Sequence, residues 1–247
     1  MRLRAVFFDI GDTLWHEALP ELSSARGQLG QAGAAAWAER NGIAAEDPAL
    51  VARAAWAALT AARAEARRTD LVEPDAAAVA REALRGLGIT ISSSQAHDLL
   101  DAIYVSGPAS GKALYADALP VLEELQLRGY LLGMITNRAF GGPRFRADLR
   151  ALGLTLAWDV EVVSAEQGYM KPHPAIFQAA LKAAALAPAE SLMVGDSLAD
   201  DVAGAQAVGM MAAWRRCPPD AEGVEPDFAF DELRELLALP GLRRAAS

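Results

Sequence analysis

The segment Ala5-Val6-Phe7-Phe8-Asp9-Ile10-Gly11-Asp12-Thr13-Leu14 joins a short apolar run to two carboxylates, a glycine and a hydroxyl. Residues 5–8 have the composition of a buried strand, and the polar residues after them have the composition of a loop. In an open α/β sheet, ligands bind in the crevice beyond the carboxyl ends of the strands. Asp9 therefore stands where a reactive carboxylate is expected, although an aspartate after a strand is by itself more typical of a turn.

The composition of the chain limits the classes of protein to which it can belong. It has 247 residues, 53% of them hydrophobic, and a formal net charge of −9. These values are typical of a globular protein with a buried core. The acidic balance argues against nucleic acid as a partner, because phosphate backbones are bound by clustered lysine and arginine. The sequence does not predict an oligomeric state.

No targeting or membrane segment is recognised. No apolar run reaches the ~18 residues that span a bilayer, so no membrane partner is expected. Asp9 interrupts the first apolar run before it attains the length of a secretory signal. The single cysteine, Cys217, can form no intrachain disulfide, which agrees with a reducing compartment. We therefore expect a cytoplasmic protein with Cys217 as a buried thiol.

The first part of the chain, after the opening segment, has the pattern of helices. Apolar residues recur at helical spacing between 76 and 87, and a similar stripe runs from Val51 to Ala62. Ser92 and Gln95 have the spacing of a capping box before a third stripe. Residues 17–111 are therefore predicted to form an inserted all-helical domain.

The later part of the chain alternates short apolar strands with helices. Strands are predicted at 131–135, 160–164, 192–194 and 211–214, with a short edge strand at 228–230. Helices are predicted from Pro120 to Arg128, from Pro174 to Ala185 and from Leu198 to Val208. The first strand, 3–8, has no partner nearby in the sequence and is expected to join this later sheet. The fold class is thus α/β: a doubly wound, mainly parallel, Rossmann-like core of residues 1–16 and 112–247.

Polar residues also gather at three other places in the predicted core. Two of these places follow predicted strands, and the third precedes a predicted helix. Thr136 and Asn137 end one strand, Lys171 precedes a helix start, and a group of carboxylates follows another strand: Asp196, Asp200 and Asp201. In a parallel sheet these strand ends meet at one edge. The set then combines a carboxylate nucleophile, hydrogen-bond donors, a cation, and carboxylates suited to Mg²⁺.

These segments resemble the four ordered motifs of the haloacid dehalogenase-like (HAD) hydrolase superfamily. The segments are Asp9-Ile10-Gly11-Asp12-Thr13, Thr136-Asn137, Lys171-Pro172-His173-Pro174 and Gly195-Asp196-Ser197-Leu198-Ala199-Asp200-Asp201. The resemblance implies that the helical insert after the first motif is a cap domain. It also implies that Asp9 attacks phosphorus to give an aspartyl-phosphate, which water then cleaves.

The resemblance assigns roles to the remaining site residues. Thr136 would hydrogen-bond the transferring phosphoryl group with Asn137 in support, and Lys171 would neutralise charge on that group and on Asp9.

A Mg²⁺ cofactor would be held by Asp9, the backbone carbonyl of Gly11 and Asp196. The family tolerates two spacings after Asp196, so Asp200 and Asp201 both remain candidates for a further ligand. We favour Asp201.

Gly11 departs from the family pattern, because phosphatases of the superfamily usually carry an aspartate there as general acid. Asp12 is a neighbour of this position, and adjacent residues in extended chain point to opposite sides. Three explanations stay open. The leaving group needs no acid, or His16, Glu17 or the cap supplies one, or the reaction is not phosphate-ester hydrolysis.

The leading prediction is a Mg²⁺-dependent phosphatase that acts on a small phosphorylated metabolite. One alternative is a metal-independent 2-haloacid dehalogenase, a branch of the family that also lacks the second acid. The acidic cluster around Asp196 favours the phosphatase, since a metal-free site that binds an anion has little use for it. The other alternative is a catalytically weak ligand-binding protein of the same fold. The identity of the substrate is not predicted.

Overall fold

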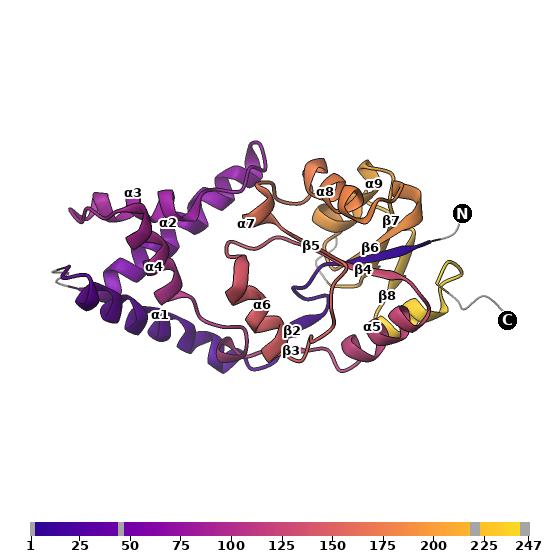
Figure 1. Cartoon of the computed structure of the whole chain (residues 1–247), viewed down its shortest axis with the longest axis horizontal. Coiled ribbons are helices and arrows are strands. Elements are labelled where there is room, and N and C mark those ends of the chain that lie inside the picture. Colours follow the sequence, from indigo (N-terminus) through magenta and orange to yellow (C-terminus); the bar gives the residue numbers. More distant parts are fainter. Residues whose placement is uncertain (1–2, 44–46, 218–222, 243–247) are drawn as a thin grey trace. The chain divides into compact units, whose positions relative to one another are not determined.

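The computed structural model describes residues 3–43, 47–217 and 223–242. The chain divides into two compact units, one of residues 1–16 and 113–247, and one of residues 17–112. We call them the core unit and the helical unit (Figure 1). Among the described residues, no helix has the length and apolar character required to cross a membrane.

The core unit is built on a six-stranded sheet whose described strand pairs are all parallel. Its strands, in chain order, are β1 (Ala5–Phe8), β4 (Leu131–Thr136), β5 (Val160–Val163), β6 (Ser191–Gly195), β7 (Met211–Arg215) and β8 (Phe228–Phe230). They lie in the order β5-β4-β1-β6-β7-β8, so β1 is central and the chain extends the sheet in both directions from it. The predicted doubly wound parallel fold is confirmed, with β8 at the edge.

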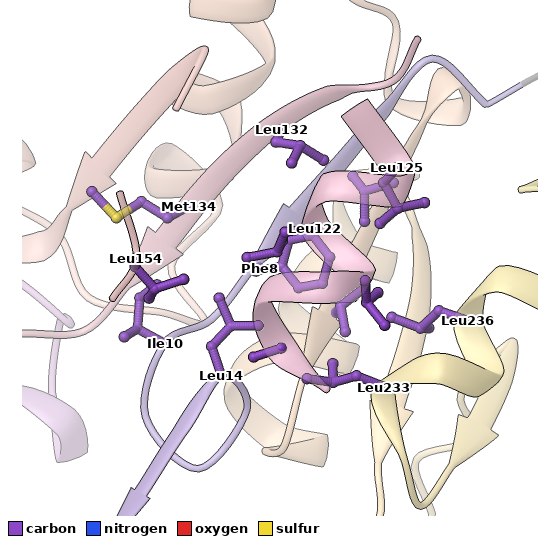
Figure 2. Packing of buried hydrophobic residues seen from close by; sticks show 14 of the residues in the cluster. Phe8, Ile10, Leu14, Leu122, Leu125, Leu132, Met134, Leu154, Leu233 and Leu236 are labelled. Atoms are coloured by element: carbon purple, nitrogen blue, oxygen red, sulfur yellow. The ribbon is translucent and has the colours of Figure 1, made fainter. Parts of the chain in front are cut away.

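Helices cover both faces of this sheet. They are α5 (Ala118–Leu127), α6 (Gly142–Ala151), α7 (Ser164–Gln167), α8 (Pro174–Ala184) and α9 (Gly204–Ala207), with shorter turns η2 (Pro188–Glu190), η3 (Leu198–Ala203) and η4 (Leu233–Ala238). Successive side chains of β1 point to opposite faces of the sheet. Phe8 packs with Leu122 of α5 and Leu233 of η4 (Figure 2), whereas Phe7 packs with Phe177 of α8. A strand buried on both faces is apolar at every position, which explains the continuous run at 5–8.

Two expectations for the core unit are wrong. The helix predicted from Leu198 to Val208 is divided, because η3 is a turn of π-helix and only the short α9 continues it. Cys217 is exposed rather than buried. Cys217 lies two residues after the end of β7, outside the sheet.

The helical unit contains α1 (Pro20–Arg40), α2 (Pro48–Arg68), α3 (Ala76–Gly86), α4 (Ser93–Ile103) and η1 (Pro108–Ser110). The predicted capping box is present at α4. Ser92 Oγ accepts a hydrogen bond from the Gln95 backbone at 3.2 Å, and Gln95 Oε1 accepts one from the Ser92 backbone at 2.9 Å. Where the chain passes between the units, β2 (Trp15–Glu17) and β3 (Lys112–Leu114) form a two-stranded sheet.

The contact between α1 and α4 supplies a test of the helical unit. A Cβ atom on Gly33 would lie 1.8 Å from the carbonyl oxygen of Ala102, whereas one on Gly27 would meet nothing within 4 Å. We expect Gly33→Ala to lower the free energy of unfolding by about 3 kcal/mol, because the helices must separate. Gly27→Ala in the same helix should leave it unchanged or raise it by up to about 1 kcal/mol, since alanine is the better helix former. Urea unfolding followed by circular dichroism measures both, and equal effects would contradict the close approach.

Candidate active site

The candidate site lies at the carboxyl edge of three adjacent strands. Asp9 directly follows β1, Thr136 is the last residue of β4, and Asp196 directly follows β6. Because β1 pairs with both β4 and β6, these residues share one end of the sheet. The backbone N–H of Asp9 donates to the carbonyl of Val194 at 2.9 Å, which continues the ladder into the site. The sheet thus brings together the residues that the sequence places at separate strand ends.

Lys171 lies at the centre of the site, and its side chain is 2% exposed. Its Nζ atom donates to Asp9 Oδ1 at 2.7 Å, to Asp201 Oδ1 at 2.6 Å and to the carbonyl of Ile135 at 2.9 Å. Three acceptors for three N–H groups fix the ammonium in one position. Burial alone would lower the pKa of Lys171, but the carboxylates of Asp201 and Asp9 outweigh it, so the pKa is raised and the group stays charged.

Asp201 reaches Lys171 because a glycine makes room for it. A Cβ atom on Gly195, at the end of β6, would lie 2.2 Å from the carboxylate carbon of Asp201. The second oxygen of Asp201 accepts a hydrogen bond from the backbone of Ser197 at 3.0 Å. Asp200 points elsewhere, since its Oδ2 accepts from the Asn137 side chain at 3.3 Å. Of the two aspartates that the sequence left as candidates, Asp201 is the one beside Asp9.

Asp9, Asp196 and Asp201 form a carboxylate cluster in which one oxygen of each lies within 4.8 Å of the others. Burial raises the pKa of Asp196 to about 6, and the charges of Asp9 and Asp12 add to the effect. Burial also raises the pKa of Asp201, against the opposing charge of Lys171. Three carboxylates and one ammonium leave an excess of two negative charges when all are ionised. Hard oxygen ligands with this charge suit a divalent cation such as Mg²⁺.

Thr136 and Asn137 have different surroundings. Thr136 is buried at the end of β4. Asn137 Oδ1 accepts from the backbone N–H of Lys171 at 2.7 Å, and its Nδ2 donates to the Lys171 carbonyl at 3.0 Å. The amide of Asn137 is therefore engaged with the chain that carries the lysine.

The turn after Asp9 shows where an acid at position 11 would stand. A Cβ atom on Gly11 would lie 3.8 Å from Asp9 Oδ2 and 3.9 Å from Trp15 Nε1, which are ordinary contacts. Asp12 is exposed in the left-handed region at φ 49°, and its carbonyl accepts from Arg215 at 2.8 Å. A Cβ atom at position 11 would thus fit without a close contact, and Asp12 lies in an exposed turn next to it.

The other two residues considered as the acid, His16 and Glu17, lie in β2. The ring of His16 stacks on the ring of Tyr115, with 4.4 Å between the centroids. Glu17 lies 3.9 Å from the ammonium of Lys112. His173, which precedes the helix predicted from Pro174, is the N-cap of α8, where its Nδ1 accepts a hydrogen bond from the Ala175 backbone at 3.2 Å.

Sequence reasoning missed Arg138 and Ser164, which meet beside the site. The backbone of Arg138 makes two hydrogen bonds with the hydroxyl of Ser164. The Arg138 guanidinium packs against the rings of Trp15 and Phe145. The position of Arg138, directly after Thr136-Asn137 at a strand end, is the signal that could have identified it.

The raised pKa of Asp196 leads to a prediction for the metal-free protein. A pKa of about 6 in the folded state, against 3.8 for the ordinary group, means that folded stability falls as the pH rises through this interval. We expect Asp196→Asn to raise the free energy of unfolding by about 1–2 kcal/mol at pH 8, after allowance for solvent screening, and by less at pH 5. Urea unfolding in EDTA measures this. Asp200→Asn, outside the cluster, is the control and should show no such gain. An equal gain for Asp196→Asn at pH 8 and pH 5 would contradict the raised pKa of Asp196.

Comparisons with known proteins identify the family of the chain. A family model described as haloacid dehalogenase-like hydrolase matches residues 3–209. A phosphoserine phosphatase of Thermus thermophilus is 36% identical over 132 residues, 52% of each chain. A glyceraldehyde 3-phosphate phosphatase of Pyrococcus furiosus is 38% identical over 127 residues, 49% of this chain and 51% of that one. The matches thus span about half the length of these curated relatives.

Two solved structures match over nearly their full length. A HAD phosphatase from Thermococcus onnurineus is 26% identical with a TM-score of 0.63, covering 98% of this chain and 100% of that one. A 2-haloacid dehalogenase from Pseudomonas syringae is also 26% identical, with a TM-score of 0.66 and coverage of 96% and 97%. With the family model spanning most of the sequence, the chain belongs to the haloacid dehalogenase-like hydrolase family.

Proposed function

We propose that the protein is a Mg²⁺-dependent phosphatase that hydrolyses a small phosphorylated metabolite with Asp9 as nucleophile. The carboxylate cluster of Asp9, Asp196 and Asp201 around a buried lysine carries this proposal. Its excess negative charge calls for a divalent cation, which a metal-free dehalogenase does not need. The phosphatase names of the sequence relatives support the same conclusion.

The residues of the core unit supply each step of such a reaction. Lys171 holds Asp9 Oδ1 at 2.7 Å, which leaves the other oxygen, on the Gly11 side, to attack phosphorus. A phosphorus–oxygen bond forms to Asp9 as the bond to the leaving group breaks, and the leaving oxygen takes a proton from solvent water, because Gly11 offers no acid. Water then attacks the aspartyl-phosphate and releases inorganic phosphate, which restores Asp9.

Charge stabilisation falls to the residues around Asp9. The ammonium of Lys171 neutralises the transferring phosphoryl group, and the Thr136 hydroxyl donates a hydrogen bond to it. Asn137 supports them by holding the backbone of Lys171. Mg²⁺, held by Asp9, Asp196, Asp201 and the carbonyl of Gly11, would add positive charge at the phosphoryl oxygens when bound.

We propose further that the helical unit serves as the cap that selects the substrate. Its place in the chain, directly after the first motif, is the place of a cap in the family that the sequence resembles. The helical unit is compact by its own contacts, as a separate selecting domain requires.

The 2-haloacid dehalogenase remains the second candidate, because Gly11 is compatible with it and a dehalogenase is among the solved structures at 26% identity. In that reaction Asp9 would attack carbon and displace chloride, and no metal would be needed.

The metal requirement separates these candidates. We expect turnover of 4-nitrophenyl phosphate that EDTA abolishes and Mg²⁺ restores, and a loss of roughly 10³-fold or more in Asp9→Asn, since the nucleophile is gone. Asp98→Asn on the exposed face of α4 is the matched control and should retain activity. Release of chloride from a 2-haloacid, unaffected by EDTA, would establish the dehalogenase instead. Absence of turnover with both substrate classes would favour the ligand-binding protein.

The open space at Gly11 provides a second test. Gly11→Asp adds a carboxyl group at a position where a Cβ atom makes only ordinary contacts with Asp9 and Trp15. We expect it to raise kcat for alkyl phosphates by about 10- to 100-fold, because poor leaving groups benefit from protonation, and to change kcat for 4-nitrophenyl phosphate little. Gly11→Asn, of the same size but without the proton, is the control. An equal gain from both variants would exclude acid catalysis as the cause.

A further inference from the structure

The last two residues of β7 contact the two turns that lead into and out of the carboxylate cluster. Trp214 Nε1 donates a hydrogen bond to the backbone carbonyl of Asp196 at 2.8 Å, and Arg215 Nη1 donates one to the backbone carbonyl of Asp12 at 2.8 Å. Trp214 lies opposite Gly195 in the pairing of β7 with β6. The end of β7 therefore supports both the turn after β6 and the turn after β1.

The turn after β1 contains a backbone conformation that requires support. The carbonyl of Ile10 accepts hydrogen bonds from the N–H groups of Leu14 and Trp15, each at 3.0 Å, which closes the turn. Inside it, Asp12 has φ 49°, a left-handed conformation that residues with a side chain adopt at a cost. Such a conformation persists where the surrounding structure holds it. The hydrogen bond from Arg215 holds Asp12 from outside the turn.

The head group of Arg215 is itself held by an aromatic ring. Its guanidinium carbon lies 3.3 Å from the centroid of the Tyr115 ring, a cation–π contact. The backbone N–H of Tyr115 donates to the carbonyl of Leu14 at 3.0 Å, so the ring is fixed to the same turn. Arg215 Nε is buried and has no hydrogen-bond partner among the described residues. The contacts with Tyr115 and Asp12 therefore outweigh the cost of burying that N–H group.

We propose that Arg215 is a positioning residue of the metal site. By holding the carbonyl of Asp12 it fixes the orientation of the neighbouring peptide, whose Gly11 carbonyl would be a ligand of Mg²⁺. The contribution of Arg215 is geometric, because its positive charge by itself opposes the binding of a cation. The inference rests on the proposed function, to which the Mg²⁺ site with the Gly11 carbonyl belongs.

The sign of the change in Mg²⁺ affinity tests this inference. Arg215→Met keeps the length of the side chain but removes both the donors and the charge. Loss of the charge alone would tighten the binding of Mg²⁺. We expect instead that the Kd for Mg²⁺ rises by about 10- to 100-fold, the usual effect of removing a group that orients a metal ligand. Titration calorimetry of MgCl₂ into the protein, freed of metal with EDTA and then dialysed, measures this Kd without substrate or turnover.

The next residue in the chain provides the matched control. Arg216 carries the same charge, but it pairs with Asp231 at 3.0 Å, and both side chains are exposed. Arg216→Met should leave the Kd for Mg²⁺ unchanged or lower it slightly. Arg215→Lys, which keeps the charge and a donor, should keep part of the affinity. A Kd for Arg215→Met that equals that of Arg216→Met or lies below it would overturn the proposal.

Urea unfolding in EDTA separates a positioning role from a general loss of structure. Arg215→Met with wild-type stability and weakened Mg²⁺ binding would support the positioning role. If Arg215→Met does not fold, Arg215→Lys decides the question. A raised Kd for Mg²⁺ at wild-type stability would support the proposal, and a wild-type Kd would overturn it.

The same measurements distinguish this inference from the proposed function. Mg²⁺ binding that depends on Arg215, in a protein that hydrolyses no phosphate ester, would support the positioning role while the proposed function fails. Mg²⁺-dependent hydrolysis with a Kd that does not depend on Arg215 would support the proposed function alone. A wild-type protein that binds no Mg²⁺ would overturn both.

Discussion

The ammonium group of Lys171 is buried between the carboxylates of Asp9 and Asp201, and the geometry of the site depends on this contact. A buried charge is tolerated only when opposite charges and hydrogen bonds replace its water. Here the Ile135 carbonyl takes the last N–H, so no donor of the ammonium is left over. Removal of either carboxylate would leave a buried cation with one partner fewer. The lysine thus orients the proposed nucleophile and at the same time holds together three segments that are distant in the sequence.

The parallel sheet makes this contact possible. Neighbouring parallel strands end at the same edge, so Asp9 after β1, Thr136 at the end of β4 and Asp196 after β6 converge without any irregular connection. Close packing then sets which side chains can enter. Gly195 leaves the volume that the Asp201 carboxylate occupies, and the Asn137 amide fixes the backbone of the lysine. The site is therefore specified by small and amide residues as much as by the charged ones.

These dependencies explain how far the sequence could predict the molecule. The strands of the core were predictable because they are short and mostly apolar, β1 throughout since both its faces are buried, and the capping box at Ser92 was predictable because its signal is local. The division of the predicted helix at 198–208 was not, since the π-helical segment contains Asp201, whose contact with Lys171 spans 30 residues and leaves no local sequence signal. The sequence favoured Asp201 over Asp200 only through the family resemblance, because the directions of neighbouring side chains in a turn depend on the backbone conformation of that turn. Arg138 was missed because its partners, Trp15 and Phe145, come from segments far apart in the chain.

The glycine at position 11 connects the chemistry of the site with its selectivity. An acid there would fill the space between Asp9 and Trp15; without one, the indole of Trp15 faces that space directly. The absence of a side chain at position 11 therefore removes a positioned proton donor and leaves the Trp15 indole as the neighbour of that position. A phosphatase built this way would depend less on proton transfer to the leaving group and more on positioning and charge, which supply most of the catalysis in phosphoryl transfer. Such an enzyme would serve substrates whose leaving groups depart readily without protonation.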